Sequence, residues 1–240
     1  MNFRCVQCGY HIKILYVQYS PGNIRLMKCK NCRAVADEYI ECEIMILLID
    51  LILHKAKAYR HLFYNMFDRE AMNFEGLIWK STFGFLLLDA YRISILSTNE
   101  EGWGSDPSLA SLSWGCGKIL LDTFLGNLSF IGILLLGTRS LLNMPVEVSG
   151  YKNILLAILA SSYLKMFLIA MMVWEFPSSV IFIIDIFVLS SNTLALKVMS
   201  EESAMAKCFG VCFCAHVVKF LISLALNIHL PKLITRMLTL

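Results

Sequence analysis

The chain has 240 residues, of which 58% are apolar and only 16% are charged, and its net charge is +3. This composition excludes an ordinary soluble domain and favours insertion into a membrane. Through residue 80 the chain has 11 Lys or Arg against 8 Asp or Glu, and beyond it 10 against 10. The whole net charge therefore lies in the N-terminal part. Such a small excess suits anionic lipid headgroups and does not indicate a nucleic-acid partner.

Four cysteines near the N-terminus form two CxxC pairs, Cys5/Cys8 and Cys29/Cys32. Two residues between cysteines let a tight turn direct both sulfurs at one ion, and two such turns complete a tetrahedral site. Twenty residues separate the pairs, at the edge of zinc-ribbon spacing. Four protein thiolates leave no position for water, so the pattern predicts a structural zinc ion. Iron in a rubredoxin-like site stays open as an alternative, whereas thioredoxin-type redox chemistry lacks its βαβ context.

Residues 1–36 are expected to form a small zinc-ribbon head. Apolar residues alternate with more polar ones over residues 10–16, Ser20-Pro21-Gly22-Asn23 has turn chemistry, and residues 24–27 read as extended. The pattern predicts a two-stranded ribbon with one CxxC pair at each end. Because a lone hairpin buries little apolar surface, metal binding would supply much of its folding free energy, ~10 kcal/mol gross.

Residues 37–66 have helical periodicity and are expected to form an amphipathic helix. The polar side chains fall at steps of three, four or seven residues on one stripe, at Glu43, Asp50, His54, Lys57 and His61. The uncharged run from Ile44 to Ile49 is far too short to cross a bilayer, which takes about 20 apolar residues. We expect the helix to lie at the membrane interface or to pack under the ribbon, with His54 and His61 on a solvated face.

The remainder, residues 77–230, is expected to cross the membrane about five times, with four crossings as the alternative. The expected spans are residues 77–96, 119–142, 154–174, 178–196 and 208–230. Several contain charges, which should face the interior of the bundle or reach the interface: Lys80, Asp89, Arg92, Asp122, Arg139, Lys165, Asp185 and Lys219. Asp89 and Arg92, three residues apart on one helix, are expected to pair locally, while Asp122 and Asp185 are open to a functional role.

The distribution of Lys and Arg in the connections favours a cytosolic head. The connections at 139–152 and 197–207 contain basic residues, whereas the loop at 98–118 is acidic. The N-terminus shows no apolar segment of a removable secretory signal. Reduced cytosolic thiols would bind metal and would not form disulfides.

Other residues have less specific readings. We expect Cys42 to be a small apolar residue, and the group Cys208, Cys212, Cys214 and His216 to be ordinary filling of an apolar span, with a second metal site or palmitoylation as the less favoured alternatives. HExxH, GxSxG and phosphate-binding glycine motifs are absent from the sequence, so no catalytic and no organic cofactor-binding residue is assigned. This favours a protein that is not an enzyme.

Several short strings, in order along the first 65 residues, resemble the homology domain of the Arv family. They are Cys5-Val6-Gln7-Cys8-Gly9, Tyr16, Tyr19 to Leu26, Cys29 to Cys32, Ala36 to Glu41, Ile49 to Lys55 and Ala58 to Leu62. Arv proteins are membrane proteins of the endoplasmic reticulum that act in sterol and lipid homeostasis. The resemblance covers the head and the helical segment after it.

The resemblance implies a cytosol-facing zinc domain with Cys5, Cys8, Cys29 and Cys32 as ligands, on a multi-pass α-helical body resident in the endoplasmic reticulum. It implies a mediator of sterol homeostasis, acting in sterol trafficking and distribution between membranes, with effects on sphingolipid metabolism. The expected partners are membrane lipids, chiefly sterols and sphingolipids. The alternatives are a zinc-ribbon adaptor for enzymes of glycosylphosphatidylinositol-anchor or other lipid synthesis, and a membrane-bound lipid-metabolising enzyme.

Overall fold

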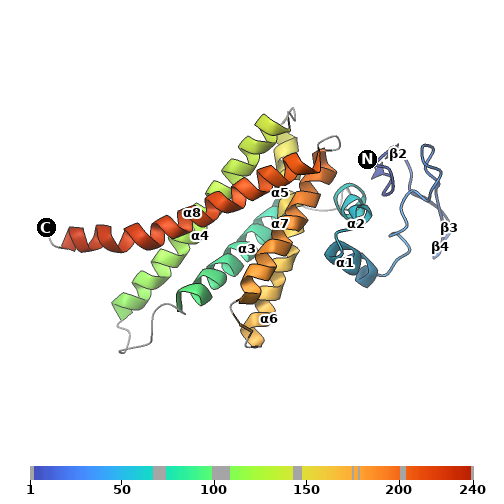
Figure 1. The fold of residues 1–240 in the computed structure, drawn as a ribbon. Coiled ribbons are helices and arrows are strands. Elements are labelled where there is room, and N and C mark those ends of the chain that lie inside the picture. Colours follow the sequence, from blue (N-terminus) through green and yellow to red (C-terminus); the bar gives the residue numbers. More distant parts are fainter. Residues whose placement is uncertain are drawn as a thin grey trace.

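The computed structural model describes residues 3–66, 74–98, 109–142, 148–174, 176–177, 179–200 and 204–238. Over these residues the protein consists of a small N-terminal head with short strands and a bundle of long helices (Figure 1). The head lies at one side of the bundle, next to helix α7 (Ser179–Ser200) (Figure 1). A multi-pass α-helical membrane protein with a small N-terminal β head is therefore confirmed.

The head contains two small antiparallel sheets. Strand β1 (Phe3–Arg4) pairs with β2 (His11–Ile12), and β3 (Tyr16–Ser20) pairs with β4 (Asn23–Leu26). The predicted hairpin turn forms between β3 and β4, where Gly22 has a φ of +81°, a conformation that favours glycine. Residues 10–12 do not extend β3 as expected. They are held beside β1 because the carbonyl of Tyr10 accepts a hydrogen bond from the N–H of Cys5 (2.9 Å).

The segment 37–66 is not one helix. Helix α1 (Ile44–Ile52) and helix α2 (Ala56–Arg60) are separated by a break at His54, whose φ is +56°, and α2 continues into a π-helical turn (His61–Met66). The helix begins at Ile44 and not at Asp37, because the Asp37 carboxylate accepts the N–H of Tyr39 (3.0 Å) and stabilises a turn. The break also removes the single polar stripe that uninterrupted periodicity predicted.

The bundle contains α3 (Phe74–Thr98), α4 (Leu109–Leu141), α5 (Val148–Ser161), a 3-10 turn (Ser162–Met166), α6 (Phe167–Val173), α7 and α8 (Met205–Leu238). Within the described residues, four stretches are long and apolar enough to cross a membrane: Ser113–Leu141, Asn153–Met171, Ser179–Ser200 and Met205–Leu226. Helix α3 covers the expected span 77–96 but does not belong to this set. The four stretches match the lower of the two expected numbers of crossings.

An apolar cluster joins the head to the bundle. Tyr59 of α2 is fully buried and packs in one core with Leu194 and Val198 of α7. Its hydroxyl lies 2.7 Å from Ser191 Oγ, and burial raises the pKa of Tyr59, so this phenol stays neutral. The Tyr64 hydroxyl donates to the Val198 carbonyl (3.0 Å). The head is therefore fixed along the C-terminal half of α7.

Candidate metal centre and a polar cluster in the membrane body

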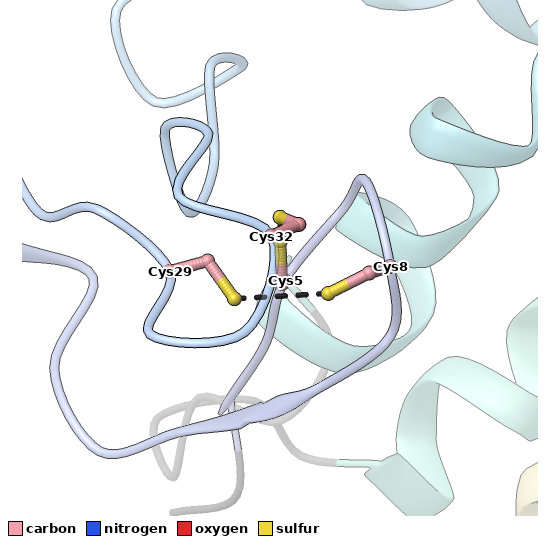
Figure 2. Close-up of side chains that lie close together, drawn as sticks. All are labelled: Cys5, Cys8, Cys29 and Cys32. Carbon is pink, nitrogen blue, oxygen red and sulfur yellow. Dashed lines mark hydrogen bonds between the residues drawn. The ribbon is translucent and has the colours of Figure 1, made fainter.

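The four predicted cysteines lie together in the head. Their Sγ atoms are all within 4.8 Å of one another. Cys5 Sγ lies 3.7 Å from Cys32 Sγ, and Cys8 Sγ lies 3.6 Å from Cys29 Sγ (Figure 2). A regular tetrahedron with zinc–sulfur bonds of about 2.3 Å has sulfur–sulfur edges of about 3.8 Å. The sulfurs thus surround a space of the size that one tetrahedral metal ion requires.

The two CxxC segments have the same backbone hydrogen bonds. The carbonyl of the first cysteine accepts the N–H four residues later, from Gly9 to Cys5 (2.8 Å) and from Arg33 to Cys29 (2.9 Å). The N–H of the first cysteine donates to the carbonyl five residues later, at 2.9 and 2.8 Å respectively. Gly9 and Arg33 both have positive φ, at +79° and +62°. Two copies of one turn thus direct four sulfurs at a common point.

The thiols of Cys5 and Cys8 have different electrostatic surroundings. Burial raises the pKa of Cys5 to about 12. For Cys8, burial has the same direction, but hydrogen bonds from the Tyr10 backbone and the Asn31 side chain lower the pKa to about 7. Metal ligation requires thiolates, so an ion at this centre would displace the Cys5 proton. The soft, all-sulfur donor set fits zinc or iron, and the cluster is a candidate metal centre.

Two side chains from the helical segment hold the head around this centre. Arg60 of α2 donates to the carbonyls of Val6 (2.9 Å) and Gln7 (3.0 Å), the two residues between Cys5 and Cys8. Arg60 therefore supports the loop between Cys5 and Cys8. Asn65 bonds both the N–H and the carbonyl of Arg4 (2.9 and 3.0 Å).

Asp37 is the polar centre of the head's core, with no exposed surface. Besides the N–H of Tyr39, its carboxylate is contacted by His61 Nδ1 (2.7 Å) and Asn65 Nδ2 (2.6 Å). The prediction of a solvated face is wrong for His61, because the break at His54 turns this side chain inward. His54 contacts α7 instead, where its Nε2 lies 2.8 Å from Ser190 Oγ. Sequence reasoning missed the roles of Asp37 and Asn65.

A second polar cluster lies inside the bundle around Asp89, whose surface is only 1% exposed. Lys165 Nζ lies 3.0 Å from Asp89 Oδ1, and Lys219 Nζ lies 2.7 Å from Asp89 Oδ2. The predicted pairing of Asp89 with Arg92 is wrong, because Arg92 Nη1 bonds Asp185 (2.9 Å). The expectation that charges within spans face the interior is confirmed for Lys165 and Lys219, whose side chains are 14% and 12% exposed.

A cavity of about 60 Å³ adjoins this cluster. The rest of its lining is aliphatic and aromatic, and its polar lining comes from Thr82, Asn127, Ser162, Lys165, Asn192, His216 and Lys219. Five bundle helices, α3, α4, α5, α7 and α8, contribute to it together with the 3-10 turn. The cavity therefore combines an apolar wall with several hydrogen-bonding groups, which is typical of a small-molecule site.

The remaining cysteines are not part of a metal group among the described residues. Cys208 and Cys212 are buried in the apolar cluster between α4 and α8, and Cys214 is exposed. Cys42 donates to the Glu38 carbonyl (3.2 Å) and lies outside the four-sulfur group. The interpretation of these residues as ordinary filling agrees with their positions.

Comparison with known proteins identifies the family of the chain. The sequence profile of the Arv1-like family matches residues 4–196. The chain belongs to the Arv1-like family. It is 51% identical to Protein ARV 1 of Arabidopsis thaliana over 221 residues, which cover 91% of this chain and 86% of the relative. It is also 32% identical to Protein ARV1 of Homo sapiens over 205 residues, covering 82% and 72% of the two chains.

The similarity extends well beyond the first 65 residues, to which the sequence strings had limited it. It includes the two CxxC loops, the helical segment that supports them and the bundle through most of α7. No solved structure matches the chain. The family is therefore established for the head and for most of the bundle together.

Proposed function

We propose that this protein is a non-enzymatic mediator of sterol homeostasis in the endoplasmic reticulum. It acts in sterol trafficking and distribution between membranes, with effects on sphingolipid metabolism. Membership of the Arv1-like family and the four apolar helices support this proposal. In this arrangement the head, with zinc bound by Cys5, Cys8, Cys29 and Cys32, faces the cytosol. The structural zinc would keep the two CxxC loops folded. Arg60 of α2 contacts the first of these loops.

The observation that carries the proposal is the mixed cavity in the bundle. A sterol has a rigid apolar body and one hydroxyl group, so a site for it needs an apolar wall with one polar end. Ser162 and Asn192 line the cavity from neighbouring elements, and their side chains lie 3.3 Å apart (Ser162 Oγ to Asn192 Oδ1). A cavity of about 60 Å³ admits only the hydroxyl end. Phe130 and Leu159 would pack against that end, and the ring system would remain outside the cavity.

The geometry of the acidic groups is consistent with the absence of catalysis. Both oxygens of Asp89 are bonded to ammonium groups, so this carboxylate is not available as a general base. Asp122 Oδ2 accepts the Ser223 hydroxyl (2.7 Å). Transport of a lipid between membranes requires neither a nucleophile nor a proton transfer. The function proposed here therefore needs only the groups that the cavity offers.

A direct test uses the full chain purified in mild detergent and a sterol probe with a photoreactive diazirine. Leu159→Phe narrows the cavity, whereas Leu128→Phe makes the same substitution on a lipid-exposed position of α4. We expect labelling of the wild-type chain to be competed by unlabelled sterol. Leu159→Phe should reduce competable labelling severalfold, and Leu128→Phe should leave it unchanged.

Co-extracted lipids and proteins should be identified from the same preparation. Retention of sterol supports the proposed function. Equal labelling of both variants, or labelling that unlabelled sterol does not compete, contradicts the cavity as a sterol site. Retention of lipid-synthesis enzymes without any sterol would favour the adaptor alternative instead.

A further inference from the structure

Helix α1 presents an apolar surface that no described part of the chain covers. Only Leu47 and Leu51 of this helix are buried, at 7% and 4% exposure, where they pack under α2. The other large apolar side chains of α1 and the residue after it are exposed: Ile44, Met45, Ile46, Leu48, Ile49, Ile52 and Leu53. A continuous exposed patch of this kind marks an interaction surface.

The position of α1 beside the bundle indicates what covers this surface. His54, two residues after α1, stacks its ring on Phe187 of α7 with the centroids 6.0 Å apart, and its Nε2 contacts Ser190 Oγ. On α7, exposed apolar side chains continue from Phe187 to Ile183 and Ile186. Because α7 is one of the four apolar stretches, this part of its surface meets lipid. The exposed face of α1 thus adjoins a lipid-facing surface.

The depth of the contact along α7 supports the same conclusion. Ser190 lies ten residues before Ser200, the last residue of α7. At a rise of about 1.5 Å per residue this is about 15 Å along the helix axis, which is half of a hydrocarbon core of about 30 Å. Figure 1 shows α1 beside the middle of α7 and away from its end near α8. A helix at this level meets acyl chains.

The two lysines that follow α1 are both paired within the head. Asp50 Oδ1 bonds Lys55 Nζ (2.7 Å), and Asp50 Oδ2 accepts the Tyr39 hydroxyl (2.8 Å). The Lys55 hydrogen bond lowers the pKa of Asp50, so this pair stays ionised and compensated. Lys57 bonds Glu38 (3.1 Å). The vicinity of α1 is therefore no basic patch for anionic headgroups, and only its apolar face is left to contact the membrane.

We propose that α1 is embedded in the leaflet on the side of the head, with its exposed face against lipid acyl chains. It anchors the metal head without crossing the membrane. Since α1 packs under α2, and Arg60 of α2 holds the first metal loop, this anchor fixes the distance of the metal centre from the bilayer. The inference does not depend on the sterol function.

The test uses the full chain reconstituted into phosphatidylcholine vesicles that contain a small fraction of phosphatidylcholine with a diazirine on its acyl chain. After irradiation, the labelled residues are mapped by peptide mass spectrometry. We expect adducts on the exposed residues of 44–53. Tyr19 in the hairpin is 66% exposed and serves as an apolar reference within the head that should not be labelled.

Matched variants separate lipid contact from general exposure. Ile49→Glu places a charge on the exposed face of α1 and should reduce labelling of residues 44–53 severalfold, whereas Val17→Glu in β3 should not. Bound zinc, measured in each variant, shows that the head is folded.

The pattern of labelled residues in the wild-type chain should be the same in vesicles with and without anionic lipid. These vesicles contain no protein other than the chain itself. Absence of adducts on α1 would therefore assign its exposed face to a protein partner and not to lipid. Equal labelling of Tyr19 and α1, or labelling that requires anionic lipid, would also overturn the inference.

Discussion

At the scale of single residues, Cys29 has two roles in the candidate metal centre. Its sulfur lies opposite that of Cys8, at 3.6 Å, and its backbone closes the second turn through hydrogen bonds on both its N–H and its carbonyl. The side chain is buried, so water cannot replace the sulfur without entering the head. Loss of this one thiolate therefore affects both the ligand set and the folding that metal binding supports.

We predict that Cys29→Ser loses the bound metal. A serine hydroxyl is a hard, poorly ionised ligand, and three thiolates do not complete the tetrahedral site. The measurement is metal per protein by mass spectrometry of the purified chain. Cys116→Ser is the control, because Cys116 is an exposed cysteine of α4 outside the group and should retain full metal content. Full metal content in Cys29→Ser would remove this residue from the ligand set.

The spacing of the cysteines was sufficient to predict which four sulfurs would meet, because the chemistry of a CxxC turn is local. The partners of Asp37 and Asp89 were not predictable in this way. Asp37 bonds Asn65, which is 28 residues away, and Asp89 bonds Lys219, which is 130 residues away. A sequence shows that a charge in an apolar helix needs a partner. It does not show which of several distant cations packing will bring near.

At the scale of elements, the close packing of α4 against α8 depends on a glycine. A Cβ atom added at Gly137 of α4 would lie 2.7 Å from Val211 Cγ1 and 3.1 Å from Val211 Cγ2 on α8. Val211 is 1% exposed and β-branched, so it has no space and few rotamers into which to move. Glycine thus permits the two spans to approach closely.

We predict that Gly137→Ala destabilises the bundle by about 1–3 kcal/mol, the usual cost of overpacking a buried site. The matched control is Gly132→Ala in the same helix, where an added Cβ meets no atom within 4 Å and alanine favours the helix. The midpoint of thermal unfolding in mild detergent measures both. Equal midpoints for the two variants would mean that the contact between α4 and α8 accommodates the added Cβ without loss of stability.

The elements themselves were predictable to different degrees. Apolar runs predicted the positions of the long helices, since length and hydropathy decide them. The break at His54 and the 3-10 turn at Ser162–Met166 were not predicted, because neither contains a proline or glycine. Both depend on tertiary contacts: His54 meets Ser190 of α7, and Lys165 in the 3-10 turn reaches Asp89 of α3.

At the scale of the whole molecule, polar contacts between distant segments connect the head with the interior of the bundle. Tyr59 of the head meets Ser191, whose hydroxyl donates to the Ser161 carbonyl (2.6 Å), and Ser161 bonds the neighbouring Asn192 (2.5 Å). Asn192 and Lys165 both line the cavity. The head and the cavity are therefore joined by direct contacts through α7, so they belong to one packed structure.

The charge balance of the bundle leads to a last prediction. Asp89 neutralises two buried ammonium groups that come from different elements, so Asp89→Asn leaves Lys165 and Lys219 without a carboxylate. Removing one partner of a buried ion pair costs about 3–5 kcal/mol, because the remaining charge keeps its desolvation penalty. We expect a large fall in the thermal unfolding midpoint in mild detergent.

The control is Asp185→Asn, which should lower the midpoint less, because the Asp185 side chain is 36% exposed. Adding Lys165→Met to Asp89→Asn should recover part of the loss, since it removes one of the stranded charges. A midpoint unchanged by Asp89→Asn would show that Asp89 does not hold the bundle together. A double variant less stable than the single one would show that the unpaired charge of Lys165 is not the cause of the loss.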